Sequence, residues 1–408
     1  NHYQTQIAIR QRVDDDLRLF IMNRIYLDYA AATPVDPQAL STMRPFWRQK
    51  FGNSTSLHFF GQEAQEALEK SRQTLAQAIN ANPEEIIFTS SATESNNFAL
   101  KGIAFANRQR GRHLLISTVE HPCVLESAHW LESQGFIVEK INVDRDGLVS
   151  PQEVEAKIKK DTILVSIMHA NNEIGTIEPI AEIGKICQKR GVYFHTDAAQ
   201  TLGKIPLDVK KDNIDLLTAS SHKIYGPKGA ACLYVRQGVA IEPLLHGGGQ
   251  EFGKRSSTVN VPAIVGFAKA VSIALENMNE ENKRITRLRD KLIEGVLETI
   301  PGAHLNGHPQ KRLANNVNFW FEFVEGEAII FELDRYGIAA STASACSSPK
   351  LEPSHVLLAC GLAPQEAHGS LRLSLGRWTT EEEIDKVLEV LPKVIAKLRR
   401  LSPFGKGR

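Results

Sequence analysis

Cysteine is scarce in this chain of 408 residues. The five cysteines are an odd number and lie far apart, at Cys123, Cys187, Cys232, Cys346 and Cys360. Secreted domains held together by disulfides carry many cysteines in pairs, so that class of protein is excluded. We expect free thiols in a reducing compartment, and hence a cytoplasmic protein of the bacterial cytosol or, alternatively, of an organelle matrix.

Charge of one sign and long apolar runs are also lacking. Lysine and arginine number 48 and aspartate and glutamate 47, which leaves a net charge of +1. This balance gives nucleic acid and anionic membranes no excess charge to bind. No apolar run reaches the ~18 residues of a spanning helix, and residues 1–24 lack the layout of a signal peptide. We expect a soluble protein without direct nucleic-acid or membrane partners.

What the chain has is a regular alternation of short apolar runs with longer helical patterns. The candidate strands are Glu85–Ser90, His113–Thr118, Phe136–Ile141, Thr162–His169, Val192–Asp197, Asp215–Ala219 and Ala231–Val235. Several are almost continuously apolar, which is typical of strands covered on both faces in a mostly parallel sheet. Ser150, Pro151 and Glu153 predict a helix start with a capping box. The pattern predicts one α/β domain over residues 34–276.

After residue 276 the pattern changes. A charged amphipathic helix is expected at Glu280–Glu298, followed by short strands around Asn315–Phe321. Thr380 and Glu383 predict the capped start of a closing helix. We expect a second, smaller α+β domain made of residues 1–33 and 277–408.

Two polar positions directly follow apolar strands. Lys223 lies in a polar turn, where partial burial would lower the pKa of its amine and let it form a Schiff base. Asp197 ends a strand, where open α/β sheets bind ligands, and could pair with a protonated pyridine nitrogen. Taken alone, Lys223 is better explained as a solvated loop lysine, and Asp197 could equally be a helix cap.

A third segment, residues 88–97, predicts a strand that ends in a hydroxyl-rich turn and opens a helix. Backbone amides at such a helix start, with the Thr93 hydroxyl, can hold a phosphate. An ordinary Ser/Thr helix cap is the alternative.

Together, these three segments resemble the pyridoxal-phosphate site of class V aminotransferase-like enzymes. Four further segments narrow the resemblance to the NifS/IscS-like cysteine desulfurases: residues 27–34, 120–122, 171–175 and 341–348. The similarity runs from about residue 25 to residue 400 in the same order. It implies the fold type I architecture of PLP-dependent transferases. The large domain would bind the cofactor, and the small domain would carry the catalytic cysteine loop at about 340–353.

The resemblance also assigns roles to single residues. Lys223 would hold pyridoxal 5'-phosphate in a Schiff base and move protons at the substrate Cα. Asp197 would pair with the ring nitrogen, Gln200 would bind the ring oxygen, and His121 would stack on the ring with an acid–base role. Further cofactor contacts are implied for Ala92, Thr93, Asn172, Ser220, His222 and, from a second subunit, Thr258. The last of these contacts implies a homodimer.

Two residues are implied in handling the substrate itself. Arg372, together with Asn172, would bind the carboxylate of L-cysteine, because a guanidinium can donate two parallel hydrogen bonds to it. Cys346 lies among small polar residues, as expected of an exposed loop thiol whose thiolate is a nucleophile. The other four cysteines are expected to be small core residues. A metal site from Cys346, His355 and Cys360 lacks paired ligand spacing, and we expect no metal.

The sequence therefore predicts a cysteine desulfurase that converts L-cysteine to L-alanine and leaves the sulfur on Cys346 as a persulfide. An acceptor protein, such as an iron–sulfur scaffold or a tRNA-thiolation carrier, would then receive the sulfur. A selenocysteine lyase or an aminotransferase on the same fold is the alternative. Ala343 and Ser257 stand where relatives often have glycine, and either would be strained if its φ angle were positive.

Overall fold

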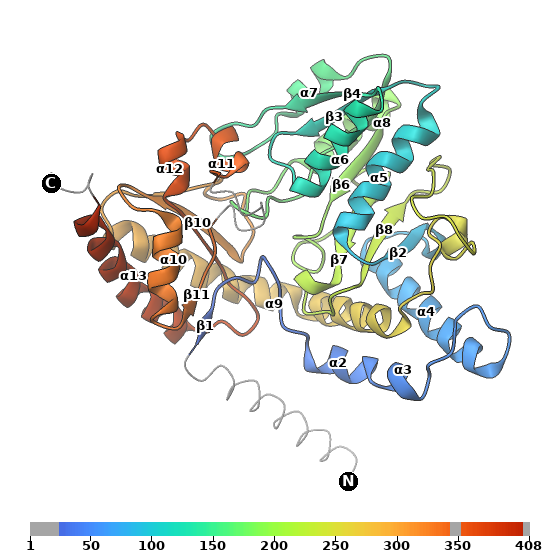
Figure 1. Ribbon diagram of the computed structural model, residues 1–408, viewed down its shortest axis with the longest axis horizontal. Coiled ribbons are helices and arrows are strands. Elements are labelled where there is room, and N and C mark those ends of the chain that lie inside the picture. Colours follow the sequence, from blue (N-terminus) through green and yellow to red (C-terminus); the bar gives the residue numbers. More distant parts are fainter. Residues whose placement is uncertain (1–23, 343–351, 403–408) are drawn as a thin grey trace, which may run out of the picture.

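The computed structural model describes residues 24–342 and 352–402, and the predictions for Ala343 and Cys346 lie outside the described residues. These residues form two bodies side by side, a larger one around a central sheet and a smaller one built from the C-terminal part of the chain (Figure 1). The site predicted from the sequence draws on both bodies.

The larger body is built on a seven-stranded sheet whose strands are ordered β2-β8-β7-β6-β5-β3-β4. Their bounds are β2 Ile86–Thr89, β3 His113–Ser117, β4 Ile137–Ile141, β5 Thr162–Ser166, β6 Tyr193–Asp197, β7 Leu216–Ser220 and β8 Ala231–Val235. All neighbours pair in parallel except at β8, which is antiparallel to both β2 and β7. Each predicted strand is confirmed to within three residues at its ends.

Helices cover both faces of this sheet. The larger ones are α4 (Phe59–Ala78), α5 (Ala92–Asn107), α6 (Pro122–Ser133), α7 (Pro151–Lys157) and α8 (Ile180–Arg190). Leu114 and Ile116 pack in one apolar core with α5 and α6, whereas Leu115 packs in the core on the other face with α4 and α8. Successive side chains of a strand point to opposite faces, so a strand buried on both sides reads as continuously apolar.

Helix α7 begins where it was predicted, but its capping box is incomplete. The Ser150 side chain accepts from the Glu153 backbone N–H at 3.3 Å, as expected for an N-cap. The Glu153 carboxylate instead accepts from the backbone N–H of Asn142 at 3.3 Å. The second half of the predicted box was therefore wrong, because the helix start is tied to the preceding strand.

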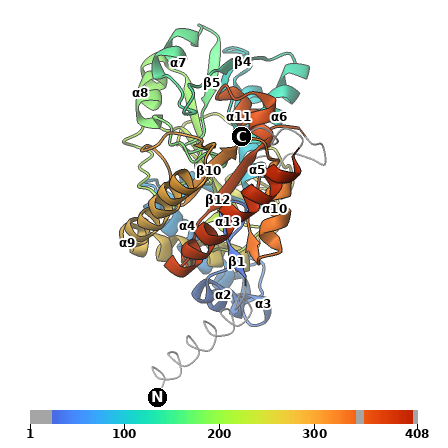
Figure 2. The same ribbon diagram turned by 90° about the vertical axis from the view of Figure 1, so that its left-hand side faces the viewer.

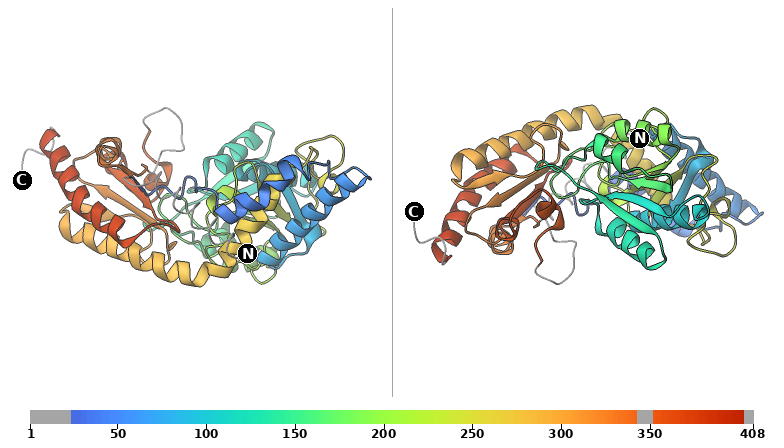
Figure 3. Two further views of the ribbon diagram at one scale, coloured as in Figure 1. Left: turned by 90° about the horizontal axis from the view of Figure 1, so that it is seen from below. Right: turned by 90° about the horizontal axis from the view of Figure 1, so that it is seen from above.

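The long helix α9 (Val261–Thr299) connects the two bodies and runs along one side of both (Figure 3). The predicted helix Glu280–Glu298 is its second half, so the predicted start was wrong by about one half of the helix. Phe267 in the first half packs in the core of the larger body, and Leu292 in the second half packs in the core of the smaller body. The division at residue 276 lies between these two groups and stays a prediction.

Among the described residues, α9 is also the one helix that could cross a membrane by length and composition alone. However, 61% of its apolar window is buried inside the protein. Its apolar side chains are thus already covered by the two cores, which is the situation of a core helix in a globular protein.

The smaller body contains a three-stranded sheet ordered β12-β10-β9, covered by α9, α10 and α13 (Figure 2). The bounds are β9 Ala303–Leu305, β10 Asn316–Phe321, β12 Ser370–Ser374, α10 Gly326–Asp334 and α13 Glu381–Leu401. The predicted capping box of Thr380 and Glu383 is confirmed at the start of α13. A short parallel pair, β1 (Ile25–Tyr26) and β11 (Ile338–Ala339), joins the N-terminal segment to this body.

Short helices complete the described chain. They are α2 Pro37–Met43, α3 Pro45–Arg48, α11 His355–Ala359 and α12 Pro364–His368, with the 3-10 turns η1 Pro83–Glu85, η2 Ser221–Lys223 and η3 Glu251–Gly253. Turn η2 follows β7 directly, and α5 begins three residues after β2. The carboxyl ends of these strands therefore lead straight into the segments that carry the predicted site.

Candidate active site

Lys223 is held by the N-terminal segment of the chain. Its Nζ donates to the backbone carbonyls of Ala30 at 2.7 Å and Ala31 at 2.8 Å. The same segment is fixed to the turn after β7, since the Thr33 N–H and hydroxyl both donate to the carbonyl of His222. The amine is therefore held against the body of the protein, which argues against a solvated loop lysine.

Gln200 reaches the same carbonyl from the turn after β6. It is buried, and its Nε2 donates to the Ala30 oxygen at 2.9 Å. Lys223 and Gln200 thus converge on one acceptor, although 23 positions separate them in the sequence. This juxtaposition places an amine and an amide donor on one side of the predicted cofactor site.

Asp197 is a buried carboxylate at the end of β6. Oδ1 accepts from the backbone N–H of Ala199 at 2.9 Å, so the carboxylate does cap its own turn. Oδ2 accepts from Nδ2 of Asn96 on α5 at 2.6 Å. Among the described residues, no ion pair to Asp197 is found, so its charge is held by neutral donors and stays available to a cationic ring nitrogen.

His121 is the N-cap of α6, and its Nδ1 accepts from the backbone N–H of Cys123 at 3.2 Å. A neutral imidazole that accepts at Nδ1 carries its proton on Nε2. Burial lowers the pKa of His121, the charge of Asp197 opposes this, and the charge of Lys223 adds to it. The ring is therefore a neutral imidazole with an N–H donor at Nε2.

Cys123 lies beside His121, contrary to the expectation of a small core residue. Its Sγ is 3.0 Å from His121 Nδ1 and 3.1 Å from Nδ2 of Asn96. The core expectation is confirmed for the buried residues Cys187, Cys232 and Cys360. For Cys123 the expectation holds only in part, because the side chain packs partly against one core while its sulfur contacts His121 in the capping turn of α6.

The predicted phosphate cradle lies at the start of α5. The Ser91 side chain caps the helix by accepting from the Glu94 N–H at 3.1 Å, so the ordinary cap is present as well. The N–H groups of Ala92 and Thr93 in the first turn have no partner within a helix, and the helix dipole favours an anion there. Both functions are thus compatible at this helix start.

Ser220 and His222 add donors at the end of β7, which α5 contacts. The Ser220 hydroxyl is 2.9 Å from Nδ1 of His222. Burial, followed by the charges of Lys223 and Lys228, lowers the pKa of His222 to about 4. His222 is therefore neutral at physiological pH and contributes hydrogen bonds and no charge.

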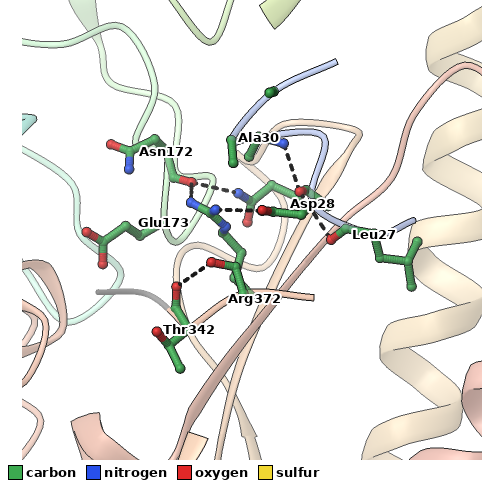
Figure 4. A network of polar contacts seen from close by, with 12 residues as sticks. Leu27, Asp28, Ala30, Asn172, Glu173, Thr342 and Arg372 are labelled. Carbon is green, nitrogen blue, oxygen red and sulfur yellow. Dashed lines mark hydrogen bonds and ion pairs between the residues drawn. The ribbon is translucent and has the colours of Figure 1, made fainter. Parts of the chain in front are cut away.

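Arg372 lies on β12 between two oxygen atoms from distant segments (Figure 4). Its Nη2 donates to Oδ1 of Asp28 at 2.8 Å, and its Nη1 donates to the backbone carbonyl of Asn172 at 3.0 Å. Its Nε is buried, with no partner among the described residues. The guanidinium is thus held in place by two acceptors and retains an unused donor for a carboxylate. The Asp28 ion pair was not predicted.

Thr258 lies apart from these residues. It is exposed, in the loop between η3 and α9, and none of its hydrogen bonds in the described chain reaches another predicted site residue. This placement fits a contact to a second copy and stays a prediction. Ser257 does not have a positive φ angle, so its replacement of glycine costs no backbone strain.

Buried carboxyls behind the site were not predicted. Glu120 is fully buried, with Oε1 accepting from the Ser117 hydroxyl at 2.6 Å and the Met168 N–H at 2.8 Å. Its Oε2 has no partner among the described residues. Burial, with the charge of Asp197 acting in the same direction, raises the pKa of Glu120 to about 8. The only sequence signal was its place before His121, where a turn carboxylate is equally common.

This carboxyl gives the fold a defined pH dependence. A folded-state pKa raised from 4.5 to about 8 contributes stability that is complete below 4.5 and is lost as pH rises through about 8. We expect the melting temperature of Glu120→Gln, relative to the unchanged protein, to increase by about 2 °C or more between pH 5 and pH 8. Thermal melts of Glu126→Gln, an exposed carboxyl on α6, serve as the control. Parallel melting curves for all three proteins would contradict the assignment.

A comparison with protein families gives one match over most of the chain. Residues 25–387 match the family described as aminotransferase class-V. The matched range includes every predicted site residue, from the segment around Asp28 to Arg372.

Individual relatives agree with this match. The chain is 53% identical to a cysteine desulfurase IscS of Methanosarcina thermophila over 93% of its own length and 94% of the relative. It is 51% identical to a cysteine desulfurase IscS of Dictyoglomus turgidum, over 93% and 96% of the two chains. Among solved structures, a NifS-like protein superimposes with a TM-score of 0.87 at 41% identity, covering 92% of this chain and all of the other.

Proposed function

This chain belongs to the class V aminotransferase family, and we infer that it is a cysteine desulfurase of that family. The observation that carries the activity is the convergence of Lys223 and Gln200 on the Ala30 carbonyl. It supplies an amine and a hydrogen-bond donor together in the turns that follow two neighbouring strands, β6 and β7. The relatives with about 50% identity are cysteine desulfurases, which supports the same reaction here.

The family implies pyridoxal 5'-phosphate, and the residues present fit that group. Asp197 offers the ring nitrogen a buried carboxylate that only neutral donors contact in the described chain, and Gln200 offers an N–H to the ring oxygen. The phosphate would be held by the start of α5 and by Ser220 and His222. When bound, the cofactor withdraws electrons from the substrate Cα.

Three side chains of the protein bind the substrate and transfer its protons. Arg372 binds the carboxylate of L-cysteine and is kept in orientation by Asp28 and the Asn172 carbonyl. The Lys223 amine would take the proton from the substrate Cα and return protons to the product. His121, neutral with its proton on Nε2, is available as an acid towards the substrate.

Cys346 is proposed to receive the sulfur. Its thiolate attacks the sulfur of the substrate, so that an S–S bond forms while the Cβ–S bond breaks. Protons then complete the methyl group of alanine. The net reaction turns L-cysteine and the enzyme thiol into L-alanine and an enzyme persulfide, which balances in atoms and electrons.

The arrangement around Arg372 makes a kinetic prediction. Arg372→Lys keeps the positive charge but loses the unused Nε donor and the planar guanidinium that Asp28 and the Asn172 carbonyl hold in orientation. We expect KM for L-cysteine to rise by about 10- to 100-fold, with a much smaller change in kcat, because the lost hydrogen bonds hold the substrate carboxylate throughout. Steady-state alanine formation measures both constants. Arg335→Lys, an exposed arginine at the end of α10, is the control, and an unchanged KM for Arg372→Lys would rule out the assignment.

A homodimer is proposed on the basis of four large apolar side chains that the segment 47–59 exposes, Trp47, Phe51, Leu57 and Phe59, each more than 60% exposed. Large apolar side chains gathered on one surface indicate a protein contact. In the same part of the chain, Phe46 packs against the small apolar cluster of Ala64, Val261 and Val265, and so does Val259, the residue after Thr258. The residues that precede the exposed segment and follow Thr258 thus share one apolar cluster, as expected if a second copy covers that segment and receives Thr258 at its own site.

The sulfur acceptor is proposed to be a second protein in the cytoplasm, such as an iron–sulfur scaffold or a tRNA-thiolation carrier. The basis is the function implied by the IscS name of the relatives. A protein acceptor also fits a persulfide enzyme, because its product is bound to the chain and must be passed on by thiol exchange.

Mass spectrometry after addition of L-cysteine tests the proposed function. We expect one added sulfur on the peptide that contains Cys346, and L-alanine formed without any amino acceptor. A requirement for an amino acceptor would instead show an aminotransferase. Turnover of selenocysteine alone would show a selenocysteine lyase.

A further inference from the structure

A second lysine, Lys204, contacts the far end of the Gln200 amide. Its Nζ donates to Gln200 Oε1 at 3.4 Å, while Gln200 Nε2 donates to the Ala30 oxygen at 2.9 Å. Lys223 donates to the same oxygen at 2.7 Å. The four groups form a row from Lys204 through Gln200 and Ala30 to Lys223. No motif or spacing in the sequence singles out Lys204.

No acidic side chain of the described chain forms an ion pair with the Lys204 amine. Lys204 lines a small cavity of about 40 Å³ between α9 and the smaller body, together with Glu281, Arg377 and Tyr225. Glu281 is paired with Arg377 at 2.6 Å, and no carboxylate of the described chain pairs with Lys204. Asn282 fixes the backbone by donating to the Lys204 carbonyl. The side-chain amine therefore has Gln200 as its hydrogen-bond partner in place of a counterion.

The two neighbours of Gln200 select one orientation of its amide. A lysine amine donates hydrogen bonds whether or not it is protonated, and a backbone carbonyl only accepts them. Lys204 therefore favours Oε1 at one end, and Ala30 favours Nε2 at the other. The reverse orientation would place a carbonyl oxygen against the anionic ring oxygen of the cofactor, which is unfavourable.

The protonation state of Lys204 is compatible with a position close to the positive charge of Lys223. Burial, with the charge of Lys223 as the second cause, lowers the pKa of Lys204 to about 7. At and above neutral pH much of the population is an uncharged amine, which donates to Gln200 without a full positive charge close to Lys223. The other charged groups facing it, Glu281 on α9 and Arg377 after β12, largely neutralise each other.

We propose that Lys204 is a positioning residue that fixes Gln200 with its N–H towards the ring oxygen of the cofactor. The proposal rests on the proposed function, because it requires a bound cofactor. By polarising the Gln200 amide, Lys204 also strengthens the hydrogen bond that Gln200 donates. A stronger donor makes the ring oxygen less basic, so the proton it shares with the Lys223 nitrogen is lost at lower pH.

The test follows the visible absorbance of the bound cofactor as a function of pH. Lys204→Met keeps the length of the side chain and removes its donor. We expect the midpoint of the absorbance change to move up by about half a pH unit, the size of one neutral hydrogen bond. Lys204→Arg keeps a donor and should restore most of the original midpoint. Lys210→Met, an exposed lysine on the same segment, should not change it.

A double-mutant cycle separates positioning from a general charge effect. In a Gln200→Leu background, Lys204→Met should cause no further shift, since its effect passes through Gln200. A persisting half-unit shift in that background, or no shift in Lys204→Met itself, overturns the proposal. Lys204→Leu provides a second removal of the donor if Lys204→Met does not fold. If the unchanged protein shows no cofactor absorbance at all, the proposed function is rejected, and the proposed role of Lys204 is rejected with it. A cofactor band that does not respond to Lys204→Met rejects only the role of Lys204.

Discussion

The protein in which alanine replaces Lys223 is expected to lose the visible absorbance of the linked cofactor and to form L-alanine at least about 10²–10⁴ times more slowly. The substitution removes an amine that serves two functions, the covalent link to the cofactor and the transfer of the Cα proton. Among the lysines of the described residues, two lie on this row of contacts, and they differ in what they reach. Lys223 is the lysine held at the Ala30 and Ala31 carbonyls, whereas Lys204 reaches only Gln200.

The matched control for Lys223→Ala is Lys228→Ala. Lys228 lies five positions later in the same turn but is exposed to solvent. Absorbance spectra and alanine assays on both variants should show a loss for Lys223→Ala alone. Retention of the cofactor band in Lys223→Ala, or equal losses in the two variants, would show that the linking lysine has been misassigned.

The second large effect is expected for Cys346→Ser. This variant should keep the absorbance of the cofactor but form no persulfide, and alanine formation should fall by about 10²-fold or more because a hydroxyl is a poor nucleophile towards sulfur. The other four thiols cannot take over this role. Burial raises the pKa of Cys123, Cys232 and Cys360 to about 12 and raises the pKa of Cys187 as well. None of these four is a thiolate at neutral pH.

Cys187→Ala is the control for Cys346→Ser. Cys187 is buried on α8, away from the predicted site, so its loss should lower stability slightly through lost packing and leave sulfur transfer intact. Mass spectrometry after addition of L-cysteine measures the persulfide in each variant. A persulfide on another cysteine of Cys346→Ser, with full turnover, would contradict the role of Cys346.

Helices and strands were predictable from the sequence where burial alone determines the pattern of apolar residues. The strands of the large sheet are buried on both faces, so their apolar runs mark them directly. The first half of α9 was missed for a related reason. Its small and apolar residues, such as Ala263 and Phe267, are buried on several sides, and the alternation of polar and apolar residues that marks an amphipathic helix is weak there.

The chemistry of the site was predictable only in part. Lys223, Asp197 and Arg372 carry the resemblance to the family, and the structure places them beside partners from distant segments. The residues that hold them were missed, because the contacts are remote in sequence. Asp28 and Arg372 are 344 positions apart, and Asn96 and Asp197 are 101 apart. No local pattern records such a contact.

The continuity of α9 restricts how the molecule can move. Its two halves are rooted in separate cores, and the backbone hydrogen bonds of a helix run unbroken between them. Pivoting one body against the other at this point would break several of those bonds at once, which makes a hinge here costly. Relative movement of the two bodies is therefore resisted by α9, which acts as a rigid spacer between the core behind Lys223 and the core behind Arg372.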